Sequence, residues 1–377
     1  MNFKFNWSRL VSKIPKEIKF IIILFVVSRL VLTLVGLVSR AELEPAVGLK
    51  YLNQPYLDVW AVWDAGWYLN IAQSGYSAQP IWQSQANYAF FPLYPLMARW
   101  LGWLVGNAAL AALIISGLAC LVAAWYLWRL VKLKFSEEQA KWAIIFFFLF
   151  PVSFLFSGLL TESLFLALLL AIFYYAETDH WPLVGILGFF LALTRSVGIV
   201  TILPLLLIYF AQRNYSWKKL DWRLIWLLLI PLGLLIFMAF NEWLTGSWLA
   251  FVTIQQAWHH FAANPAITLY RGLFSGNHYW VFNSAFTIII LALVLGFWKK
   301  ITTPYVWLSL FFIIIPLASS VTSLNSMSRY LAVIFPIFWL LGSPTWPKWL
   351  RWGLAVVCGA LQLYLMAGWT RSGFFVV

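Results

Sequence analysis

The stretch IKFIIILFVVSRLVLTLVGLV, residues 18–38, decides the fold class of this chain, because Lys19 and Arg29 are its only charged residues. A helix of about 20 mostly apolar residues is long enough to cross the hydrocarbon core of a bilayer. A cleaved signal peptide is the alternative, but its apolar core has only about 7–15 residues. The residues Ser39, Arg40 and Ala41 that follow also make a poor cleavage site. We therefore predict a retained transmembrane helix.

The same apolar character recurs along the whole chain of 377 residues, of which 63% are hydrophobic and 10% charged. A soluble domain has about 45–50% apolar and about 25% charged residues. The composition therefore predicts an all-α, polytopic integral membrane protein that forms one domain over residues 1–377. We expect about eleven transmembrane helices, at residues 18–38, 107–131, 142–158, 160–177, 181–194, 196–212, 224–243, 281–298, 303–321, 329–342 and 349–368.

The net charge of +13 does not indicate a nucleic-acid partner, because the basic residues are spread over short connections instead of forming one stripe. Most of them fall on one side of the membrane if the basic segment 1–17, with Lys4, Arg9 and Lys13, is cytoplasmic. This is the asymmetry that the positive-inside rule describes. We therefore predict a multi-pass protein of the cell (inner or plasma) membrane, in contact with membrane lipids, with residues 39–106 and 245–280 outside.

The outer segment 39–106 carries the acidic residues Glu42, Glu44, Asp58 and Asp64 among many aromatic residues. Its central part reads VWDAGWYLNIAQSGY, residues 62–76, and prolines interrupt its later part. Trp and Tyr are enriched at the membrane interface, so we expect short amphipathic helices lying along the membrane surface. The second outer loop, residues 245–280, contains His259 and His260, whose simplest interpretation is a solvated pair.

Three charged residues open or interrupt helices on the same outer side: Glu162, Arg195 and Arg329. Charges at such positions are costly and usually face a cavity, which makes each a candidate for function. The structural alternatives are a helix-start carboxylate with Thr161 as the cap for Glu162, and snorkelling to lipid phosphate for the arginines.

Together these residues predict a site for a lipid phosphate on the outer face. Arginines can hold phosphate oxygens with two parallel hydrogen bonds, aromatic rings can carry a sugar or an isoprenoid chain, and a carboxylate can accept a proton. We predict Asp64 as the catalytic residue and Arg195 and Arg329 as ligands of the donor phosphate. The predicted substrate-binding residues are Trp63, Trp67, Tyr68, Glu162, Tyr330, His259 and His260.

Five motifs stand in a fixed order along the chain: WDAGWYLNIAQSGY, AFFPLYPL, SGLLTESLFLALL, TRSVG and SRYLAVIFPIF. In this order the chain resembles the PIG-V-like mannosyltransferases, which are glycosyltransferases of the GT-C fold, as a bacterial-type relative. The resemblance implies that Asp64 is the acid of the first outer loop used in catalysis. It also implies a polyprenyl-phosphate sugar donor, commonly mannose, and a lipid or glycan acceptor. The chain departs from the family at Val197, where an Asn is frequent, and it lacks a strict DxD because Asp58 and Asp64 are six residues apart.

The expected reaction is an inverting sugar transfer, in which Asp64 takes the proton of the acceptor hydroxyl and the arginines stabilise the leaving phosphate. No cofactor is firmly predicted, although Asp64 and Asp58 offer ligands for a divalent cation, Mg²⁺ or Mn²⁺. A polysaccharide ligase or polymerase is an alternative that would not need Asp64. A lipid-linked-sugar transporter is less favoured, because repeated halves with matching broken helices are not recognisable in the sequence.

Overall fold

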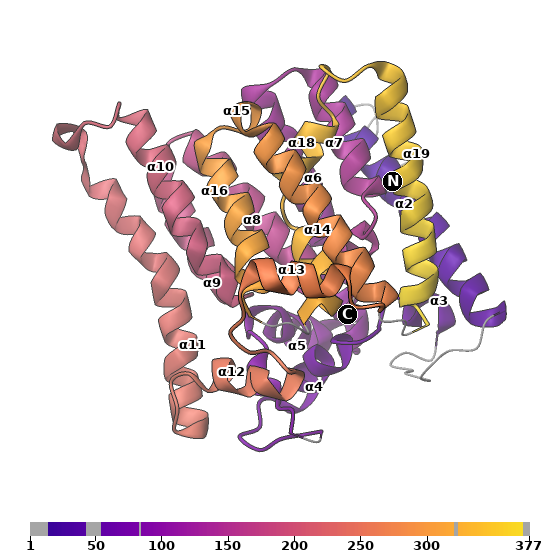
Figure 1. Ribbon diagram of the computed structural model, residues 1–377. Helices are drawn as coiled ribbons and strands as arrows, with labels where there is room; N and C mark the ends of the chain where they lie inside the picture. Colours follow the sequence, from indigo (N-terminus) through magenta and orange to yellow (C-terminus); the bar gives the residue numbers. More distant parts are fainter. Residues whose placement is uncertain (1–13, 43–53, 83, 320–322, 372–377) are drawn as a thin grey trace, which may run out of the picture.

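The computed structural model describes residues 14–42, 54–82, 84–319 and 323–371. Lys4, Arg9 and Lys13 of the basic N-terminal segment, and Glu44 of the first outer segment, lie outside the described residues. The described part of the chain is helical, and its only β-type pairing is an isolated bridge between Trp82 and Gln85 (Figure 1). The predicted all-α class is therefore confirmed.

Five of the described helices are long and apolar enough to cross a bilayer, as expected for a multi-pass membrane protein. They are α2 (Lys16–Glu42), α6 (Ala108–Lys134), the continuous η5–α11 (Trp222–Thr245), α14 (His278–Gly296) and α19 (Lys348–Trp369). Shorter apolar helices stand between them: α9 (Trp181–Ala192), η3–α10 (Ser196–Gln212) and α16 (Thr303–Leu317). All of these begin and end within a few residues of the predicted spans.

Two predicted spans are not continuous helices. Residues 142–158 divide into α7 (Glu137–Leu149) and the short η2 (Ser153–Ser157), with Pro151 between them. Residues 329–342 divide into α17 (Met327–Leu331) and α18 (Pro336–Leu341). Proline lacks the N–H that continues a helix, and its ring clashes with the preceding turn. The expectation of a single continuous helix was therefore wrong for both stretches.

The break after α7 leaves backbone carbonyl groups inside the protein, and α19 supplies their partner. The amide Nε2 of Gln362 donates to the carbonyl oxygens of Phe148 at 2.8 Å and of Phe150 at 3.3 Å. Arg29 of α2 donates from Nη1 to the carbonyl oxygen of Ser153 at 3.2 Å. Buried backbone groups need such partners, so these two polar side chains stabilise the break.

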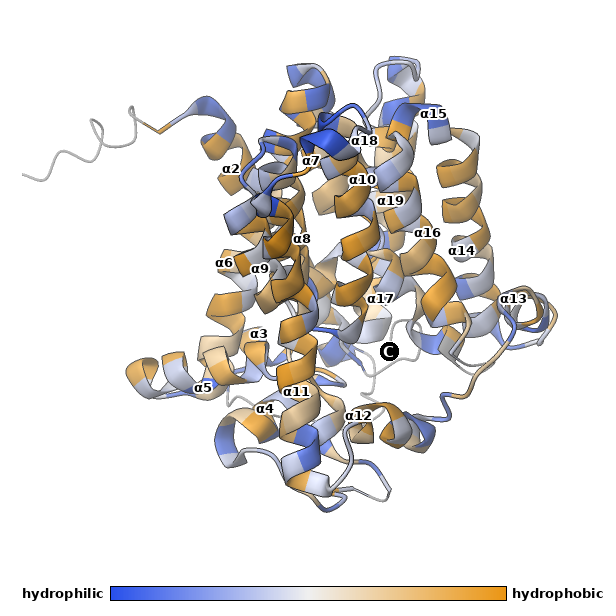
Figure 2. Ribbon diagram, turned by 90° about the vertical axis from the view of Figure 1, so that its left-hand side faces the viewer, coloured by the Kyte–Doolittle hydropathy of each residue, from blue (hydrophilic) through white to orange (hydrophobic). Residues whose placement is uncertain are grey.

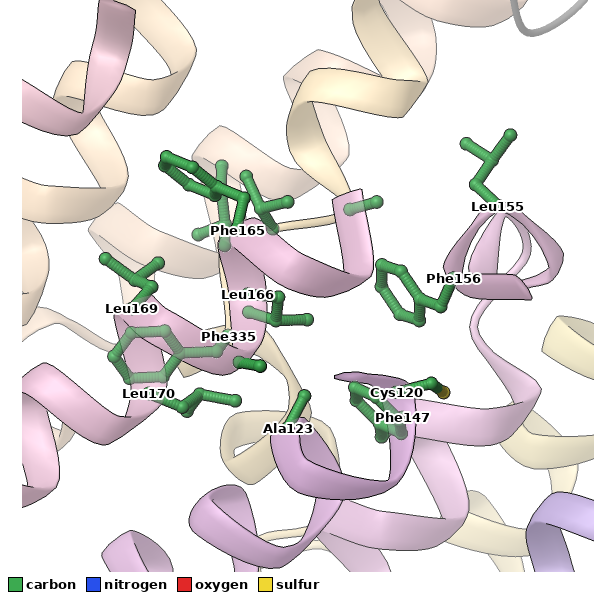
Figure 3. Packing of buried hydrophobic residues seen from close by; sticks show 14 of the residues in the cluster. Cys120, Ala123, Phe147, Leu155, Phe156, Phe165, Leu166, Leu169, Leu170 and Phe335 are labelled. Carbon is green, nitrogen blue, oxygen red and sulfur yellow. The ribbon is translucent and has the colours of Figure 1, made fainter. Parts of the chain in front are cut away.

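Helix α8 (Glu162–Glu177) lies at the centre of the bundle and is buried along nearly its whole length. A helix that is apolar all round belongs in a core and not on a surface. Figure 3 shows its side chains Leu166 and Leu170 near Ala123 of α6. The small alanines of α6 let the two helices approach closely, and the packing fixes the position of Glu162 at the start of α8.

The two ends of the bundle differ in chemistry. We call one the basic end; Lys134, Arg213, Lys300 and Arg351 lie there, and Lys134 pairs with Glu177 at the C-terminus of α8 at 2.7 Å. The other, the site end, holds Glu162 and the short helices α3 (Pro55–Asp58), α4 (Ala65–Ser74), α5 (Leu93–Val105) and α12 (Ala250–Thr253). Figure 2 shows these short helices together at the bottom of the bundle, away from α7 and α15 (Trp298–Ile301).

Helix α5 has the character of an interfacial helix. Its residues Trp100, Trp103 and Leu104 are exposed, whereas Tyr94 and Ala98 on its other face are buried. It ends at Gly106, whose φ of 76° suits glycine. An exposed apolar face with tryptophans fits the headgroup region of a bilayer, as predicted from the sequence.

Candidate active site

Asp64 stands at the start of α4, after the buried residues Trp60, Ala61 and Val62. Its backbone carbonyl begins the helix by accepting from the N–H of Trp67 at 3.0 Å. An aspartate at this position usually caps the helix with its side chain, but the Asp64 carboxylate makes no such bond. Instead, its Oδ2 accepts a hydrogen bond from Nη1 of Arg329. The carboxylate therefore points toward the charged cluster described next.

Glu162 begins α8, and the chain before it is tied to the first outer segment. The N–H of Leu159 donates to the carbonyl of Trp60 at 3.0 Å. Thr161 has helical backbone angles and makes no side-chain cap, so the structural alternative in which it caps α8 does not hold. Its hydroxyl lies 3.4 Å from the hydroxyl of Tyr68 instead. The Glu162 side chain is completely buried, and a charge in such a place needs partners.

Those partners are two arginines. Oε1 of Glu162 accepts from Nε of Arg329, and Nη1 of Arg195 donates to the same oxygen at 2.6 Å. Because Arg329 also donates to Asp64, the four side chains form one chain of ion pairs: Asp64, Arg329, Glu162, Arg195. We call this set the ionic cluster. It joins four segments far apart in sequence and contains two negative and two positive charges.

Each arginine lies on a segment with a further contact, outside the ionic cluster. Arg195 has extended backbone just before η3, and its guanidinium lies 5.3 Å from the ring centre of Tyr330. Arg329 lies on the short helix α17, and its neighbour Ser328 on the same helix donates its N–H to Oδ1 of Asn283 at 2.9 Å. Asn283 is itself fully buried on α14. Both arginines are therefore fixed by contacts outside the ionic cluster.

The four side chains of the ionic cluster differ in exposure. The Asp64 side chain is 25% exposed and that of Arg195 15%, whereas Arg329 is 7% exposed and Glu162 is not exposed at all. A ligand from solvent or membrane can therefore reach Asp64 and Arg195 first. Glu162 was predicted to bind substrate, but its burial behind the arginines gives it the position of a supporting carboxylate.

The two outer segments meet beside Asp64. The ring of Trp67 stacks on Phe90 with 5.5 Å between centroids, and Trp258 of η6 (Ile254–Trp258) packs edge-on against Trp67 at 5.7 Å. Two residues further on, His260 lies close enough for the Asp64 carboxylate to influence its titration. Burial lowers the pKa of His260 below 6.5, while the negative charge of Asp64 acts in the opposite direction.

The two neighbouring histidines, His259 and His260, differ in exposure. His259 has a φ of 58° and is exposed, whereas His260 is partly buried near Asp64.

Trp63, which precedes Asp64, also has a positive φ, of 57°. Such a conformation costs about 1–3 kcal/mol for a residue with a side chain and persists where the surroundings impose it.

Tyr68 and Tyr330 differ in access, although both were predicted to contact substrate. Tyr68 is 6% exposed, packed at 5.3 Å from both Phe90 and Tyr94. Burial raises the pKa of Tyr68 to about 12, so its hydroxyl stays protonated at neutral pH. Tyr330 is only partly buried beneath Arg195.

The acidic residues do not form a convincing metal site. Asp58 pairs with Nη1 of Arg40 at 3.7 Å, and Asp64 pairs with Arg329. Among the residues that the structure describes, no group of three or more His, Cys, Asp or Glu side chains could hold a metal ion. A divalent cation prefers several oxygen ligands, and here each carboxylate is already engaged by an arginine. Arg195 and Arg329 are the positive charges that the described residues bring to this site.

Three supporting residues were not recognised from the sequence: Asn283, Arg29 and Gln362. Each is a buried polar side chain within an apolar span, and each holds a backbone group of a broken segment. A polar residue in the middle of an apolar run is a sequence feature that could have identified them.

Comparison with known proteins extends only to the fold. No family model matches the chain, and no curated protein matches it. The structure is similar to that of ArnT from Cupriavidus metallidurans bound to undecaprenyl phosphate, with a TM-score of 0.54 and 14% sequence identity. The match covers 89% of this chain and 62% of that chain, so this chain spans less than two thirds of the length of ArnT. The chain therefore has the all-α, GT-C type membrane fold that the sequence predicts.

Proposed function

We propose that this protein is a membrane glycosyltransferase that transfers a sugar from a polyprenyl phosphate to a lipid or glycan acceptor at the outer membrane face. The observation that carries the proposal is the ionic cluster, in which a partly exposed carboxylate and two arginines meet at the site end of the fold. The undecaprenyl phosphate bound by ArnT supports a polyprenyl-phosphate donor. The resemblance to PIG-V-like enzymes favours mannose as the sugar.

The arginines bind the donor phosphate in this proposal. Within the described part of the chain, the ion pair of Arg195 uses Nη1, which leaves its other N–H groups for phosphate oxygens. The leaving group is a phosphate monoester, whose second pKa of about 6 means that it departs as an anion. Positive charge fixed near the departing oxygen stabilises that anion better than a proton donor would.

Asp64 acts as the general base. The acceptor oxygen forms a bond to the anomeric carbon while the bond from that carbon to the phosphate oxygen breaks. The phosphate leaves with the bonding electron pair, and Asp64 takes the proton of the acceptor hydroxyl. A single displacement of this kind inverts the anomeric configuration. Base catalysis of this type contributes about 10²–10⁴-fold to the rate.

The aromatic residues beside Asp64 provide the sugar-binding surface. Trp63 and Trp67 are partly exposed on either side of the carboxylate in the sequence, and Trp258 closes over Trp67 from the second outer loop. The apolar face of a pyranose packs well on an indole ring. We assign His260, whose titration is influenced by the Asp64 charge, to a hydrogen bond with the acceptor hydroxyl.

The test uses the purified full-length protein, polyprenyl phosphate carrying labelled mannose, and a membrane lipid extract as acceptor. We expect label to move into an acceptor product with inverted linkage, and transfer to continue within about twofold after chelation of divalent cations, because the arginines supply the positive charge. Donors carrying other hexoses, assayed in parallel, test the choice of mannose. Failure to transfer from every polyprenyl-phosphate sugar would reject the proposal, and transfer that survives loss of Asp64 would favour a polysaccharide ligase or polymerase.

A further inference from the structure

The ionic cluster is balanced before any substrate arrives. Two carboxylates and two guanidinium groups share three ion pairs, and each arginine donates to at least one carboxylate oxygen. The phosphodiester of a polyprenyl-phosphate sugar adds one negative charge to this balanced set, and the phosphate monoester that leaves carries about 1.5 to 2. Two carboxylates and a phosphate cannot all be neutralised by two arginines, so one carboxylate has to give up its contact.

The structure indicates which carboxylate is exchanged. Glu162 is completely buried and accepts from both arginines, so its removal from the cluster would leave an isolated charge in the protein interior. Asp64 is 25% exposed and accepts from Arg329 alone within the ionic cluster. It also stands at a helix start, where its side chain makes no capping hydrogen bond that would have to break.

We propose that the donor phosphate displaces Asp64 from Arg329, so that donor binding releases the base. This inference rests on the proposed function and adds an order of events to it. Before the donor binds, Arg329 holds the Asp64 carboxylate within the ionic cluster. When phosphate takes the place of the carboxylate on Arg329, Asp64 turns toward the acceptor hydroxyl. The acceptor is therefore deprotonated only when a donor is present.

The exchange of Asp64 for phosphate on Arg329 predicts how loss of the Asp64 charge changes the affinity for phosphate. If Asp64 competes with phosphate for Arg329, then Asp64→Asn removes the competitor and strengthens phosphate binding. If Asp64 contacts the donor directly, the same substitution weakens binding. Loss of a close competing ion pair corresponds to about a tenfold change in the dissociation constant.

The experiment measures the dissociation constant of sugar-free undecaprenyl phosphate for the purified full-length protein in detergent. The matched control is Asp179→Asn, which removes one negative charge at the far end of α8. That end is about 24 Å from Glu162 at about 1.5 Å per residue. We expect about tenfold tighter binding by Asp64→Asn and less than a twofold change for Asp179→Asn. Asp64→Ser serves as a second variant without a carboxylate, with the same expectation.

The outcomes separate this inference from the function on which it rests. Equal or weaker binding by both Asp64 variants, with normal binding by the parent, overturns the exchange and leaves the glycosyltransferase proposal standing. Absence of undecaprenyl phosphate binding by the parent overturns both. Tighter binding that appears equally in Asp179→Asn also overturns the exchange, because it reports the total charge of the protein and not competition at Arg329.

Discussion

The substitution Arg195→Lys tests how the donor phosphate is held, because it keeps the positive charge and removes the planar fork. In the structure the guanidinium donates to Glu162 at 2.6 Å and lies over the ring of Tyr330 at 5.3 Å. A lysine ammonium is a compact charge on a flexible stem, so it cannot fill both positions and still face the phosphate. We expect it to stay with the buried Glu162.

The magnitude follows from the contacts that lysine gives up. A hydrogen bond to a charged group contributes about 1.5–3 kcal/mol. Loss of one such bond to the phosphate corresponds to about 10- to 100-fold in affinity, since about 1.4 kcal/mol is a factor of ten. The cation–π contact with Tyr330 adds only about 0.5–1 kcal/mol, and lysine can retain part of it.

The assay compares donor KM and kcat/KM for the parent and the Arg195→Lys protein, with labelled polyprenyl-phosphate mannose as donor. The control is Arg213→Lys at the basic end, where Arg213 pairs with Asp221 at 2.8 Å, far from the donor. We expect the control to keep the parent kinetics. If Arg195→Lys also stays within about twofold of the parent, the arginine does not bind phosphate and serves only to neutralise Glu162 or to contact lipid headgroups.

Three further predictions concern the membrane topology, the role of Asn283 in holding α17, and the pH dependence of stability. A cysteine introduced at Ser77 should react with an impermeant reagent on intact cells; reaction only after the membrane is opened would place the site end in the cytoplasm. Asn283→Leu should lower both the thermal unfolding temperature and kcat/KM, because the N–H of Ser328 loses its acceptor at a cost of about 1–3 kcal/mol, and no change in either would exclude a supporting role. Burial lowers the pKa of His260 below its unfolded value of 6.5, so the folded protein binds fewer protons and its free energy of unfolding should decrease as the pH falls below about 6.5. His260→Gln should reduce this dependence; an unchanged dependence in that variant would contradict the assignment.

The membrane helices could be predicted because their length and composition are set by the bilayer, not by their neighbours. Residues 18–38, for example, lie within α2 with its ends only a few residues away. Hydropathy does not reveal where a helix is interrupted, however, because an interrupted apolar stretch is still apolar. Pro151 and Pro336 stand at the two breaks. At the first break, the carbonyl groups of Phe148 and Phe150 accept hydrogen bonds from Gln362, which lies far away in the sequence.

The sequence also predicted that Asp64, Glu162, Arg195 and Arg329 share one face, since the order of helices brings their ends to the same side. It could not predict their pairing, because that depends on how deeply each helix start is buried. Glu162 begins α8 at the centre of the bundle and is sealed off, whereas Asp64 begins α4 at the edge. Sequence reasoning gave both carboxylates contact with substrate, and the structure separates them by burial, since Asp64 is 25% exposed and Glu162 is not exposed.

The central claim is that Asp64 is the base of a sugar transfer at the site end, and one rate measurement tests it most directly. Asp64→Asn keeps the shape of the side chain, which is 25% exposed, and removes its ability to accept a proton. With saturating polyprenyl-phosphate mannose and acceptor extract, the parent and variant proteins should unfold at similar temperatures and bind donor phosphate at least equally well. We predict that kcat of the variant falls at least about 100-fold. A kcat within a few-fold of the parent would contradict the account, because the acceptor proton would then have another destination.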